Sequence, residues 1–323
     1  MRAVVVTEPG GPESMTWADV PAPTLAPGEI LIDVAATAVN RADVLQRQGF
    51  YPPPPGASDI LGLECSGTVA AVTDGSNFGV GDQVCALLTG GGYAQQVAVP
   101  AGQVMPLPPG VDVLTAASIP EVACTVWSNL VHVARVQPGD VVLIHGGAGG
   151  IGTHAIQVCK ALGARVAVTA GTAAKLEQCT ELGADICINY HDQDFVDVIK
   201  RDAGGADVVL DNMGAKYLER NVNVLAADGR IVVIGLQGGI KAELNLSKLL
   251  TKRGAVHATS LRGRPVQQKE AICADVVAHV WPMFSDGKVR PIIDSVVPIA
   301  EAAQAHERME SSGHVGKIVL AVS

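Results

Sequence analysis

The sequence predicts an α/β protein that combines a mostly β part with a doubly wound parallel sheet, and three observations carry this prediction. The chain has 323 residues, a length that suggests about two domains. Roughly the first 110 residues alternate short Val-, Ile- and Ala-rich runs with Pro-Gly, Pro-Pro and Asp-Gly turn signals. From about residue 120 the pattern changes to strand, helix, strand, helix around a glycine-rich turn.

The first part is expected to form a compact, mostly β domain with one short helix at residues 41–48. Four consecutive prolines at residues 52–55 make a rigid segment that cannot join a central strand. The glycines at residues 90–92 are expected to be a backbone pivot. The strands are predicted at residues 3–7, 29–37, 65–73 and 83–88.

The middle part has six strand candidates joined by helices, which is what two mononucleotide-binding halves of a doubly wound sheet require. The strands are predicted at residues 141–145, 165–169, 186–189, 207–211, 230–234 and 255–259. The helices are predicted at residues 151–162, 173–182, 195–202 and 216–226.

The remaining residues are expected to return to the first domain, which would make that domain discontinuous. They contain a long helical stretch at about 266–285, a strand at 295–298, a helix at 301–311 and a last strand at 317–322. The predicted domains are therefore residues 1–120 for the first part of the β domain, 121–262 for the nucleotide-binding domain, and 263–323 for the return.

Composition narrows the class of protein. Hydrophobic residues make up 48% of the chain and charged residues 17%, so a large core is available. The formal net charge of −9 argues against a nucleic-acid partner, which needs a basic surface. We expect no membrane span, because no apolar run approaches the required length of about 18 residues. The seven scattered cysteines form no Cys-x-x-Cys pair and indicate reduced thiols in a cytoplasmic protein.

The predicted strand 141–145 leads into the sequence GGAGGIG at residues 146–152 and then into an apolar helix. Gly147, Gly149 and Gly152 fit the G-x-G-x-x-G dinucleotide pattern in its expected context. Glycine allows a tight turn and a close approach of the backbone to a pyrophosphate. The following helix would offer that pyrophosphate free N–H groups and a positive dipole end. The alternative, a tight strand–helix turn without a ligand, is less favoured in this context.

The next turn favours NADPH over NADH. An NAD enzyme usually has an acid near this point to bind the ribose hydroxyls, and here no acid occurs until Glu177. Thr172 has the features of a helix N-cap, which places Lys175 at the third helical position. A lysine there opposes the helix dipole unless an anion is nearby, and a 2′-phosphate would be that anion. A solvated surface lysine is the alternative.

Several sequence blocks, in this order, resemble the zinc-free quinone oxidoreductases of the medium-chain dehydrogenase/reductase superfamily. They resemble most closely the branch whose animal member is induced by a tumour suppressor. Besides the glycine loop, the blocks are AVNRAD at 38–43, QRQGFY at 46–51, LGLE at 61–64, GGGYA at 90–94, SIPE at 118–121 and VGKIVL at 315–320.

This resemblance implies a GroES-like catalytic domain with its active site in a cleft against the nucleotide-binding domain. Asn40 and Tyr51 match positions that face the nicotinamide and the substrate, and Thr125 matches a threonine beside the nicotinamide ribose. Relatives often have Ser or Ala in place of Gly149, so a side-chain contact there would be missing. The matched cofactor contacts are Gly149, Gly150, Ile151 and Gly152 at the pyrophosphate, Gly171, Lys175 and Tyr190 at the 2′-phosphate, Asn212, Gly235, Leu236, Ser260 and Leu261 along the adenosine and nicotinamide, and Lys317 as a late contact.

The same resemblance argues against a catalytic zinc. The zinc alcohol dehydrogenases of the superfamily have a Cys where this chain has Asn40, and a His in the block at residues 62–64. A catalytic zinc needs three protein ligands, and the sequence does not supply them. Cys65 is expected to be a small buried residue, and His145 and His154 are expected to be packed or solvated.

The resulting prediction is a homodimeric, NADPH-dependent quinone oxidoreductase whose partner is a small-molecule quinone. Tyr51 and Asn40 would donate hydrogen bonds to the quinone oxygen as negative charge develops. An NADPH-dependent enone or enoyl reductase uses the same fold, with Tyr51 as the available proton donor. A nucleotide-binding scaffold without catalysis is a third possibility. The strand at 255–259 is the expected edge through which two copies would join.

Overall fold

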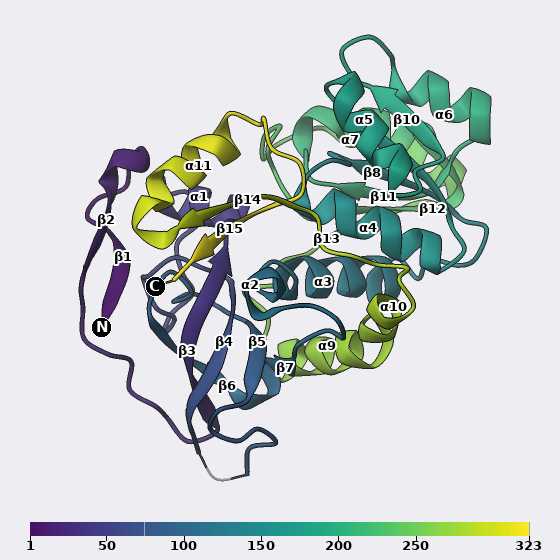
Figure 1. Cartoon of the computed structure of the whole chain (residues 1–323). Helices are drawn as coiled ribbons and strands as arrows, with labels where there is room; N and C mark the ends of the chain where they lie inside the picture. The colour runs from purple at the N-terminus through teal and green to yellow at the C-terminus, as the bar shows by residue number, and fades with distance from the viewer. Residues whose placement is uncertain (74, 323) are drawn as a thin grey trace. The chain divides into compact units, whose positions relative to one another are not determined.

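The computed structural model describes residues 1–73 and 75–322, which fold into two compact units. Unit 1 comprises Met1–Cys124, Leu261–Asp286 and Pro291–Ser323. Unit 2 comprises Thr125–Ser260 and Gly287–Arg290. The mixed α/β fold class is confirmed, and the two units are described separately (Figure 1). The predicted domain boundaries remain a prediction about which parts fold as independent domains.

Unit 1 is built on a seven-stranded sheet whose centre is strand β3 (Glu29–Ala38). Strand β3 pairs antiparallel with β4, β6 and β15. Its side chains alternate, so that Ile30, Ile32 and Val34 enter the core. The other strands of the sheet are β4 (Glu64–Val72), β5 (Gln83–Leu87), β6 (Gln96–Pro100), β7 (Val104–Pro106), β14 (Ile293–Pro298) and β15 (Lys317–Ala321). Strands β1 (Arg2–Val6) and β2 (Met15–Asp19) form a separate antiparallel pair.

The helices of unit 1 range from 4 to 14 residues. They are α1 (Arg41–Arg47), α2 (Val113–Ala116), α9 (Val266–His279), α10 (Trp281–Ser285) and α11 (Ala302–Glu310), with 3₁₀ turns η1 (Pro12–Ser14), η2 (Ala101–Gln103) and η4 (Ile299–Glu301). The single helical stretch predicted at 266–285 is divided into α9 and α10 at Val280. Pro282 follows directly, and a proline has no N–H to continue a helix. Helix α3 (Pro120–Trp127) crosses the boundary between the units.

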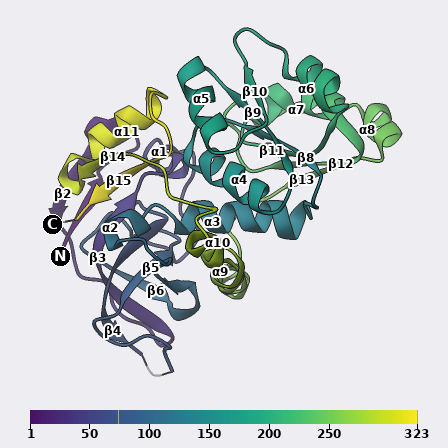
Figure 2. The same ribbon diagram turned by 45° about the vertical axis from the view of Figure 1, so that its right-hand side comes forward.

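Unit 2 contains a six-stranded parallel sheet in the order β10-β9-β8-β11-β12-β13, with helices along both faces (Figures 1 and 2). All six predicted strands are present. They are β8 (Val141–His145), β9 (Arg165–Ala170), β10 (Ile186–Asn189), β11 (Ala206–Asp211), β12 (Leu225–Val233) and β13 (Ala255–Ala258). The helices are the π-helical turn η3 (Ser128–Val133), α4 (Gly150–Ala161), α5 (Ala173–Glu181), α6 (Phe195–Ala203), α7 (Ala215–Val224) and α8 (Leu246–Lys252).

Some elements differ from the sequence prediction for identifiable reasons. The helix predicted at 216–226 ends at Val224, and β12 begins at Leu225 rather than at residue 230. The first half of β12 contains Asp228 with a φ of 61°, so it lacks the regular alternation by which a strand is recognised in a sequence. Helices α2 and α8 and strands β2, β6 and β7 were not predicted, because each is short and weakly patterned. Among the described residues, no helix is both long and apolar enough to cross a bilayer.

His145, at the end of β8, connects three elements of unit 2 from a buried position. Its Nδ1 lies 3.2 Å from Thr169 Oγ1 on β9, and its Nε2 lies 2.8 Å from Asn221 Oδ1 on α7. Because an amide oxygen can only accept, Nε2 carries the proton and the ring is neutral. Phe195 and Tyr217 each pack an edge against the ring, with centroids 4.8 Å away. Burial lowers the pKa of His145 from 6.5 to about 4.

This lowered pKa makes the stability of unit 2 depend on pH. Between pH 6.5 and pH 4, His145 binds a proton in the unfolded chain but not in the folded chain. The free energy of unfolding is therefore not reduced by His145 above pH 6.5, and it falls as the pH is lowered towards 4. The shift corresponds to on the order of 3 kcal/mol. We expect His145→Gln to reduce the fall in unfolding free energy between pH 7 and pH 5 in urea denaturation, although the buried His154, whose pKa is also lowered to about 4, should preserve part of it. The same change at the exposed His279 should leave the slope intact, and an unchanged slope in His145→Gln would contradict the prediction.

Candidate active site

A fully buried carboxylate lies at the centre of unit 1. Glu64 opens β4, and its side chain is inaccessible to solvent. Its Oε1 accepts from Lys317 Nζ at 2.6 Å and from Asn40 Nδ2 at 2.9 Å. Its Oε2 accepts the backbone N–H of Glu121 at 2.9 Å, in the first turn of α3. A negative charge at this end of a helix is also favoured by the helix dipole.

Lys317, the first residue of β15, supplies the positive charge for this site. Its Nζ lies 2.6 Å from both Glu64 Oε1 and Asn40 Oδ1, and its side chain is 6% exposed. A buried ion pair offsets its desolvation only when further hydrogen bonds are made, and here Lys317 also donates to Asn40 while Glu64 also accepts from Asn40 and Glu121. The cofactor contact expected of Lys317 stays a prediction. The observed contacts hold Asn40 and Glu64.

Asn40 was expected to donate a hydrogen bond to a substrate, and its contacts do not favour that role. Its Nδ2 donates to Glu64 Oε1 and, at 3.3 Å, to the carbonyl of Ala38. Its Oδ1 accepts from Lys317. Both amide hydrogens are therefore engaged, and Oδ1 retains one further lone pair. The amide is fixed in orientation and can serve a ligand as an acceptor.

Helix α1 begins at Asn40 through a buried capping interaction. Asp43 Oδ2 accepts the backbone N–H of Asn40 at 2.8 Å, and Asp43 Oδ1 accepts that of Gly62 at 3.0 Å. Burial raises the pKa of Asp43 to about 7, because desolvation outweighs these hydrogen bonds. These contacts give Asp43 a structural role. They fix the position of Asn40 at the start of the helix.

Tyr51 is held from one side by an arginine that sequence reasoning did not identify. The guanidinium carbon of Arg262 lies 5.3 Å from the centre of the Tyr51 ring, and Arg262 Nη1 donates to the Tyr51 carbonyl at 3.4 Å. Arg262 Nη2 also donates to Gln46 Oε1 at 2.8 Å. Tyr51 follows Gly49, which has a φ of 82° that favours glycine. No local sequence pattern marks Arg262, because its partners are about 210 residues away.

In unit 2, most of the candidate cofactor residues lie at one edge of the sheet. The strands are parallel, so their carboxyl ends share this edge. The glycine loop follows β8, Gly171 follows β9, Asn212 follows β11, and Gly235 lies just beyond β12. Ser260 lies just beyond β13. This is the edge at which open α/β sheets bind nucleotides.

The glycine loop is as tight as its sequence predicted. Gly149 is the N-cap of α4, and Gly150, Ile151 and Gly152 form its first turn. A Cβ on Gly152 would lie 2.4 Å from the carbonyl oxygen of Gly146, so no other residue fits there. A Cβ on Gly147 would lie 2.7 Å from Val168 Cβ. Gly149 has no such close neighbour, so the backbone there has room for a small side chain.

The predicted N-cap on the second turn is confirmed. The Thr172 side chain accepts the backbone N–H of Lys175 at 3.3 Å, which places Lys175 at the third position of α5. A Cβ on Gly171 would lie 2.4 Å from the Tyr190 hydroxyl and 3.3 Å from His191 Nε2. Gly171 is therefore required for the exposed rings of Tyr190 and His191 to lie close to this turn. His191 was missed because a lone histidine after a strand carries no specific signal.

Asn212 provides an unused polar atom on the same edge. Its Oδ1 is buried without a hydrogen-bond partner within the described residues. A Cβ on Gly146 would lie 2.8 Å from Asn212 Nδ2, and a Cβ on Gly235 would lie 2.9 Å from the Asn212 carbonyl oxygen. Gly146 therefore lies against the Asn212 side chain and Gly235 against its backbone, and the side-chain oxygen is left as an acceptor. This orphaned acceptor and the glycine cradle fit a bound dinucleotide.

Thr125 and Ser260 are brought close to each other by Asn129 in the π-helical turn. Asn129 Nδ2 donates to the Thr125 carbonyl at 2.8 Å, and Asn129 Oδ1 accepts from Thr259 Oγ1 at 2.6 Å. Single π turns are frequent at functional sites. Leu236 is 54% exposed beyond β12, and Leu261 begins the next segment of unit 1. The arrangement keeps Ser260 at the sheet edge beside the helix that carries Thr125.

Comparisons with known proteins agree with this architecture. The family model "Alcohol dehydrogenase GroES-like domain" matches residues 26–109, "Alanine dehydrogenase/PNT, C-terminal domain" matches 114–216, and "Zinc-binding dehydrogenase" matches 182–320. A quinone oxidoreductase of Rattus norvegicus is 32% identical over 99% of this chain and 97% of its own length. The chain belongs to the quinone oxidoreductase family. That family is part of the medium-chain dehydrogenase/reductase superfamily.

Solved structures of relatives extend the comparison. Escherichia coli quinone oxidoreductase complexed with NADPH is 28% identical, with a TM-score of 0.89 over 99% of this chain and 100% of that chain. The CurK enoyl reductase is 29% identical, with a TM-score of 0.87 over 100% of this chain and 99% of that chain. The chain is therefore similar in structure to proteins whose names describe different hydride acceptors.

The Glu64–Lys317 pair gives a direct test of what holds the site of unit 1 together. Lys317→Met should leave a buried carboxylate without its cation and lower the unfolding free energy by on the order of 3–5 kcal/mol. Adding Glu64→Gln to that variant should recover most of the lost unfolding free energy, because no unpaired buried charge then remains. The measurement is chemical denaturation of both single variants and the double variant.

A matched control is available in unit 2. The Lys160–Asp185 pair lies at 2.9 Å with side chains that are 36% and 34% exposed, so Lys160→Met should cost less than about 1 kcal/mol. If Lys317→Met lowers the unfolding free energy no more than Lys160→Met does, the role of the buried pair is contradicted. It is also contradicted if the Lys317→Met, Glu64→Gln double variant is as unstable as Lys317→Met alone.

Proposed function

We propose that the protein is an NADPH-dependent, zinc-independent quinone oxidoreductase. The observation that carries the proposal is the glycine cradle at the carboxyl edge of the parallel sheet, with Lys175 in the first turn of the next helix. Full-length similarity to quinone oxidoreductases supports the acceptor. We also propose a cytoplasmic location, since all seven cysteines are free thiols.

Residues of unit 2 would hold NADPH by its phosphates. The first turn of α4 offers backbone N–H groups to the pyrophosphate, with Gly149, Gly150, Ile151 and Gly152 admitting its close approach. Lys175 and Tyr190 would pair with the 2′-phosphate, and His191 joins them because it lies beside Gly171. The remaining contacts are assigned to Thr125, Asn212, Gly235, Leu236, Ser260, Leu261 and Lys317.

Lys175 should decide the choice between NADPH and NADH. A charge-assisted hydrogen bond is worth about 1.5–3 kcal/mol, which corresponds to a roughly 10- to 150-fold preference for NADPH. Lys175→Ala should remove most of this preference in Kd measurements while leaving NADH binding nearly unchanged. Lys160→Ala, at another lysine of the same unit, is the control. Equal Kd values for both nucleotides in the unmodified protein would rule out the assignment.

The proposed reaction reduces a quinone to a hydroquinone, with one hydride from the bound nucleotide and one proton from water. Bound NADPH supplies the hydride. Tyr51 would donate a hydrogen bond to the quinone oxygen that gains charge, and Arg262 keeps its backbone and ring in place. Asn40 would act as a fixed acceptor, since its amide hydrogens are bound to Glu64 and Ala38.

Tyr51→Phe should test this donor. If the hydroxyl stabilises the developing charge, kcat and kcat/KM should fall together by roughly tenfold, which corresponds to about 1.4 kcal/mol, and the Kd for NADPH should not change. Tyr190→Phe is the matched change at the nucleotide: it should weaken NADPH binding and leave kcat at saturating NADPH unaffected. If kcat/KM of Tyr51→Phe is unchanged on every quinone tried, the hydroxyl does not act as a donor, and Tyr51 only covers the substrate position.

An enone or enoyl reductase is the second candidate, and similarity to the CurK enoyl reductase is the observation that favours it. Reduction of an activated double bond needs a proton on the α-carbon, and Tyr51 is the available donor. Steady-state turnover of a quinone panel against an enone panel, with NADPH as reductant, separates the two activities. Tight NADPH binding without turnover of either panel would favour the non-catalytic scaffold.

Zinc independence is supported by the chemistry of the side chains in unit 1. In the described residues, no three His, Cys, Asp or Glu side chains come together as metal ligands. Asn40 stands where the zinc alcohol dehydrogenases are expected to have a ligand, and Glu64 lies in the block where they are expected to have another. In this chain both side chains contact the ammonium of Lys317 instead. A cation between these groups disfavours a second cation at the same place. Burial raises the pKa of the neighbouring Cys65 well above its usual value, so its thiol stays protonated.

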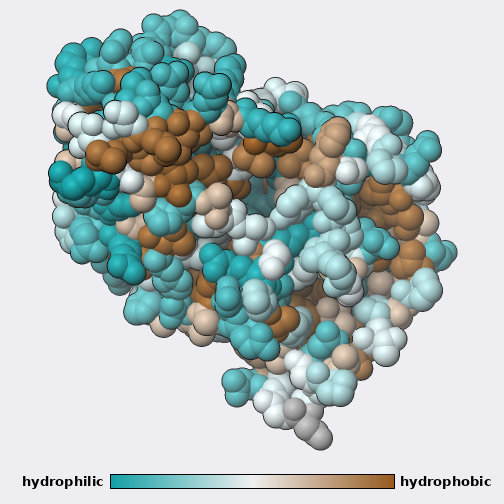
Figure 3. Space-filling model, turned by 180° about the vertical axis from the view of Figure 1, so that it is seen from behind, coloured by the Kyte–Doolittle hydropathy of each residue, from teal (hydrophilic) through white to brown (hydrophobic). Residues whose placement is uncertain are grey.

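We also propose a homodimer joined through β13. This strand lies at one end of the six-stranded sheet, as the sequence predicted for the last strand. In the adjoining segment, Leu246 and Leu250 are 68% and 78% exposed, while Leu249 packs against the core. Residues four apart lie on the same side of a helix, so α8 presents two leucines outward beside an unpaired edge. Brown apolar areas are visible on the back of the molecule (Figure 3).

Charge on this leucine pair should dissociate the dimer. Leu246→Lys with Leu250→Lys should convert the protein to a monomer in light scattering at micromolar concentration, because two ammonium groups cannot be buried unpaired. Val296→Lys is the control, since Val296 is 50% exposed on β14, the edge strand of the other sheet. A monomer for the unmodified protein, or a dimer for the double variant, would contradict the proposed interface.

A further inference from the structure

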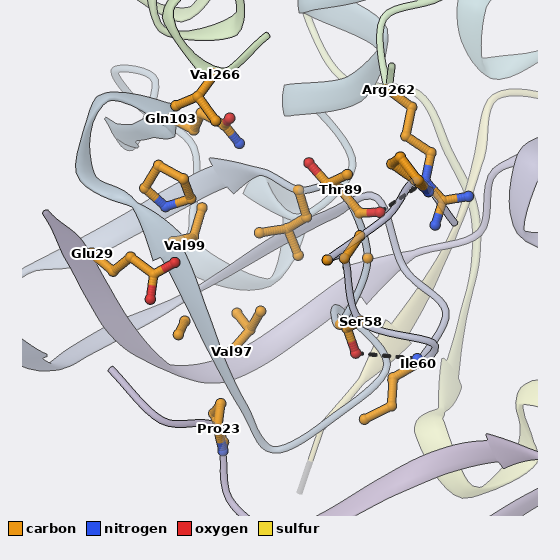
Figure 4. A pocket seen from close by; sticks show the side chains of 18 of the residues that line it. Pro23, Glu29, Ser58, Ile60, Thr89, Val97, Val99, Gln103, Arg262 and Val266 are labelled. Atoms are coloured by element: carbon orange, nitrogen blue, oxygen red, sulfur yellow. Dashed lines mark hydrogen bonds between the residues drawn. The ribbon is translucent and has the colours of Figure 1, made fainter. Parts of the chain in front are cut away.

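Unit 1 contains a cavity of about 540 Å³, and one of its lining residues is Arg262, which also contacts Tyr51. Strand β6, the loop around Ser58 and the start of α9 form its walls (Figure 4). Neither Asn40 nor Tyr51 lines it. Its lining is mainly apolar and includes Ile60, Leu88, Val97 and Val99.

Two buried cations line one side of this cavity. Lys269 is 4% exposed and Arg262 is 6% exposed. Both are anchored on one residue: Lys269 Nζ donates to Thr89 Oγ1 at 2.6 Å, and Arg262 Nε donates to the Thr89 carbonyl at 2.8 Å. Figure 4 shows Arg262 and Thr89 together on this wall. Among the described residues, neither cation forms an ion pair with a carboxylate.

This arrangement is unusual because two like charges are buried side by side. Burial lowers the pKa of Lys269, and the charge of Arg262 lowers it further. Lys269 has three N–H groups and uses one of them on Thr89, so two remain for a ligand. Desolvated charges of this kind are normally paired. An anion in the cavity would pair both cations at once.

Other polar groups of the lining also lack partners. Arg264 Nε and Gln103 Oε1 are buried without a hydrogen bond within the described residues. Gln103 is 1% exposed, and its amide nitrogen is bound to the carbonyl of Leu87, so its oxygen is left as an acceptor. Helix α9 begins at the wall with no side chain capping its first N–H groups, which adds positive potential. Glu29 lies on the side away from Arg262 (Figure 4).

We propose that this cavity binds a small organic monoanion with an apolar body, such as an aromatic carboxylate. The carboxylate would lie against Lys269 and Arg262, and the hydrocarbon would lie on Val97 and Val99. A hydroxyl group on the ligand would satisfy Gln103 Oε1. Glu29 at the opposite side sets the orientation, because the anionic end is repelled from it.

Three ligands with one ring system test this proposal by calorimetry on the full chain: 2-naphthoate, 2-naphthol and 6-hydroxy-2-naphthoate. We expect 2-naphthoate to bind at least tenfold more tightly than 2-naphthol, and 6-hydroxy-2-naphthoate to bind at least as tightly as 2-naphthoate. Equal affinities for 2-naphthoate and 2-naphthol would show an apolar cavity without an anion site and would overturn the proposal. Absence of 2-naphthoate binding would also overturn it.

Variants locate the site. Lys269→Met should weaken 2-naphthoate binding at least tenfold with little change for 2-naphthol, and Lys269→Arg should retain most of the affinity. Lys241→Met, at an exposed lysine of unit 2, is the matched control. Ile60→Trp fills the cavity from its apolar side, keeps the charges and should abolish binding, so the proposal remains testable if Lys269→Met does not fold.

A final arm separates this site from the proposed substrate position. Tyr51→Phe, which keeps the ring against Arg262, should leave 2-naphthoate affinity unchanged, and a saturating quinone should not displace the ligand. If a saturating quinone displaces the ligand and Lys269→Met does not weaken its binding, the ligand occupies the proposed substrate position and the second site is refuted. Failure of quinone turnover would leave this result unaffected.

Discussion

A lysine and a glutamate that lie 253 residues apart in the sequence form a buried ion pair on which unit 1 depends. Glu64 binds Lys317, the amide of Asn40 and the first turn of α3, so one carboxylate connects strand β15, helix α1 and helix α3. Removing either partner would leave an unpaired charge buried in the core. The same contacts fix the Asn40 amide and commit its hydrogens, so the ion pair sets the chemistry that Asn40 can offer as well as its position.

In unit 2 the backbone, rather than an ion pair, shapes the candidate site. Its parallel strands end at one edge, and glycines at that edge leave room that any side chain would fill. His145 ties β8, β9 and α7 together immediately before the glycine loop, so the loop starts from a rigid anchor. A phosphate site that consists largely of backbone N–H groups needs such an anchor, because its precision comes from the position of the main chain. Lys175 is proposed to add selectivity for NADPH to this site.

Local patterns in the sequence were sufficient for the sheet of unit 2, for its tight glycine loop and for the Thr172 cap. The strands there are continuous apolar runs, and the glycine loop and the Thr172 cap depend on neighbours within a few residues. The Glu64–Lys317 pair, the clamp of Arg262 on Tyr51 and the Thr89 anchor of two cations were not predictable in this way. Their partners are far apart in the chain and carry no periodic signal. The donor role expected of Asn40 stays a prediction, and the contacts that engage its amide hydrogens, to Glu64 and Ala38, carry no local signal either.

The discontinuity of unit 1 has a consequence for synthesis on the ribosome. Strands β3 and β4 emerge early, yet β15 is made last and contributes the ammonium that neutralises Glu64. At about 5–20 residues per second, the 253 residues between Glu64 and Lys317 take roughly 13–50 s to make. Throughout that time the nascent sheet lacks strand β15, and Glu64 lacks the lysine that pairs with it in the folded core. Unit 2 can complete its folding meanwhile, so the first part of the chain must wait, exposed to chaperones, for the last.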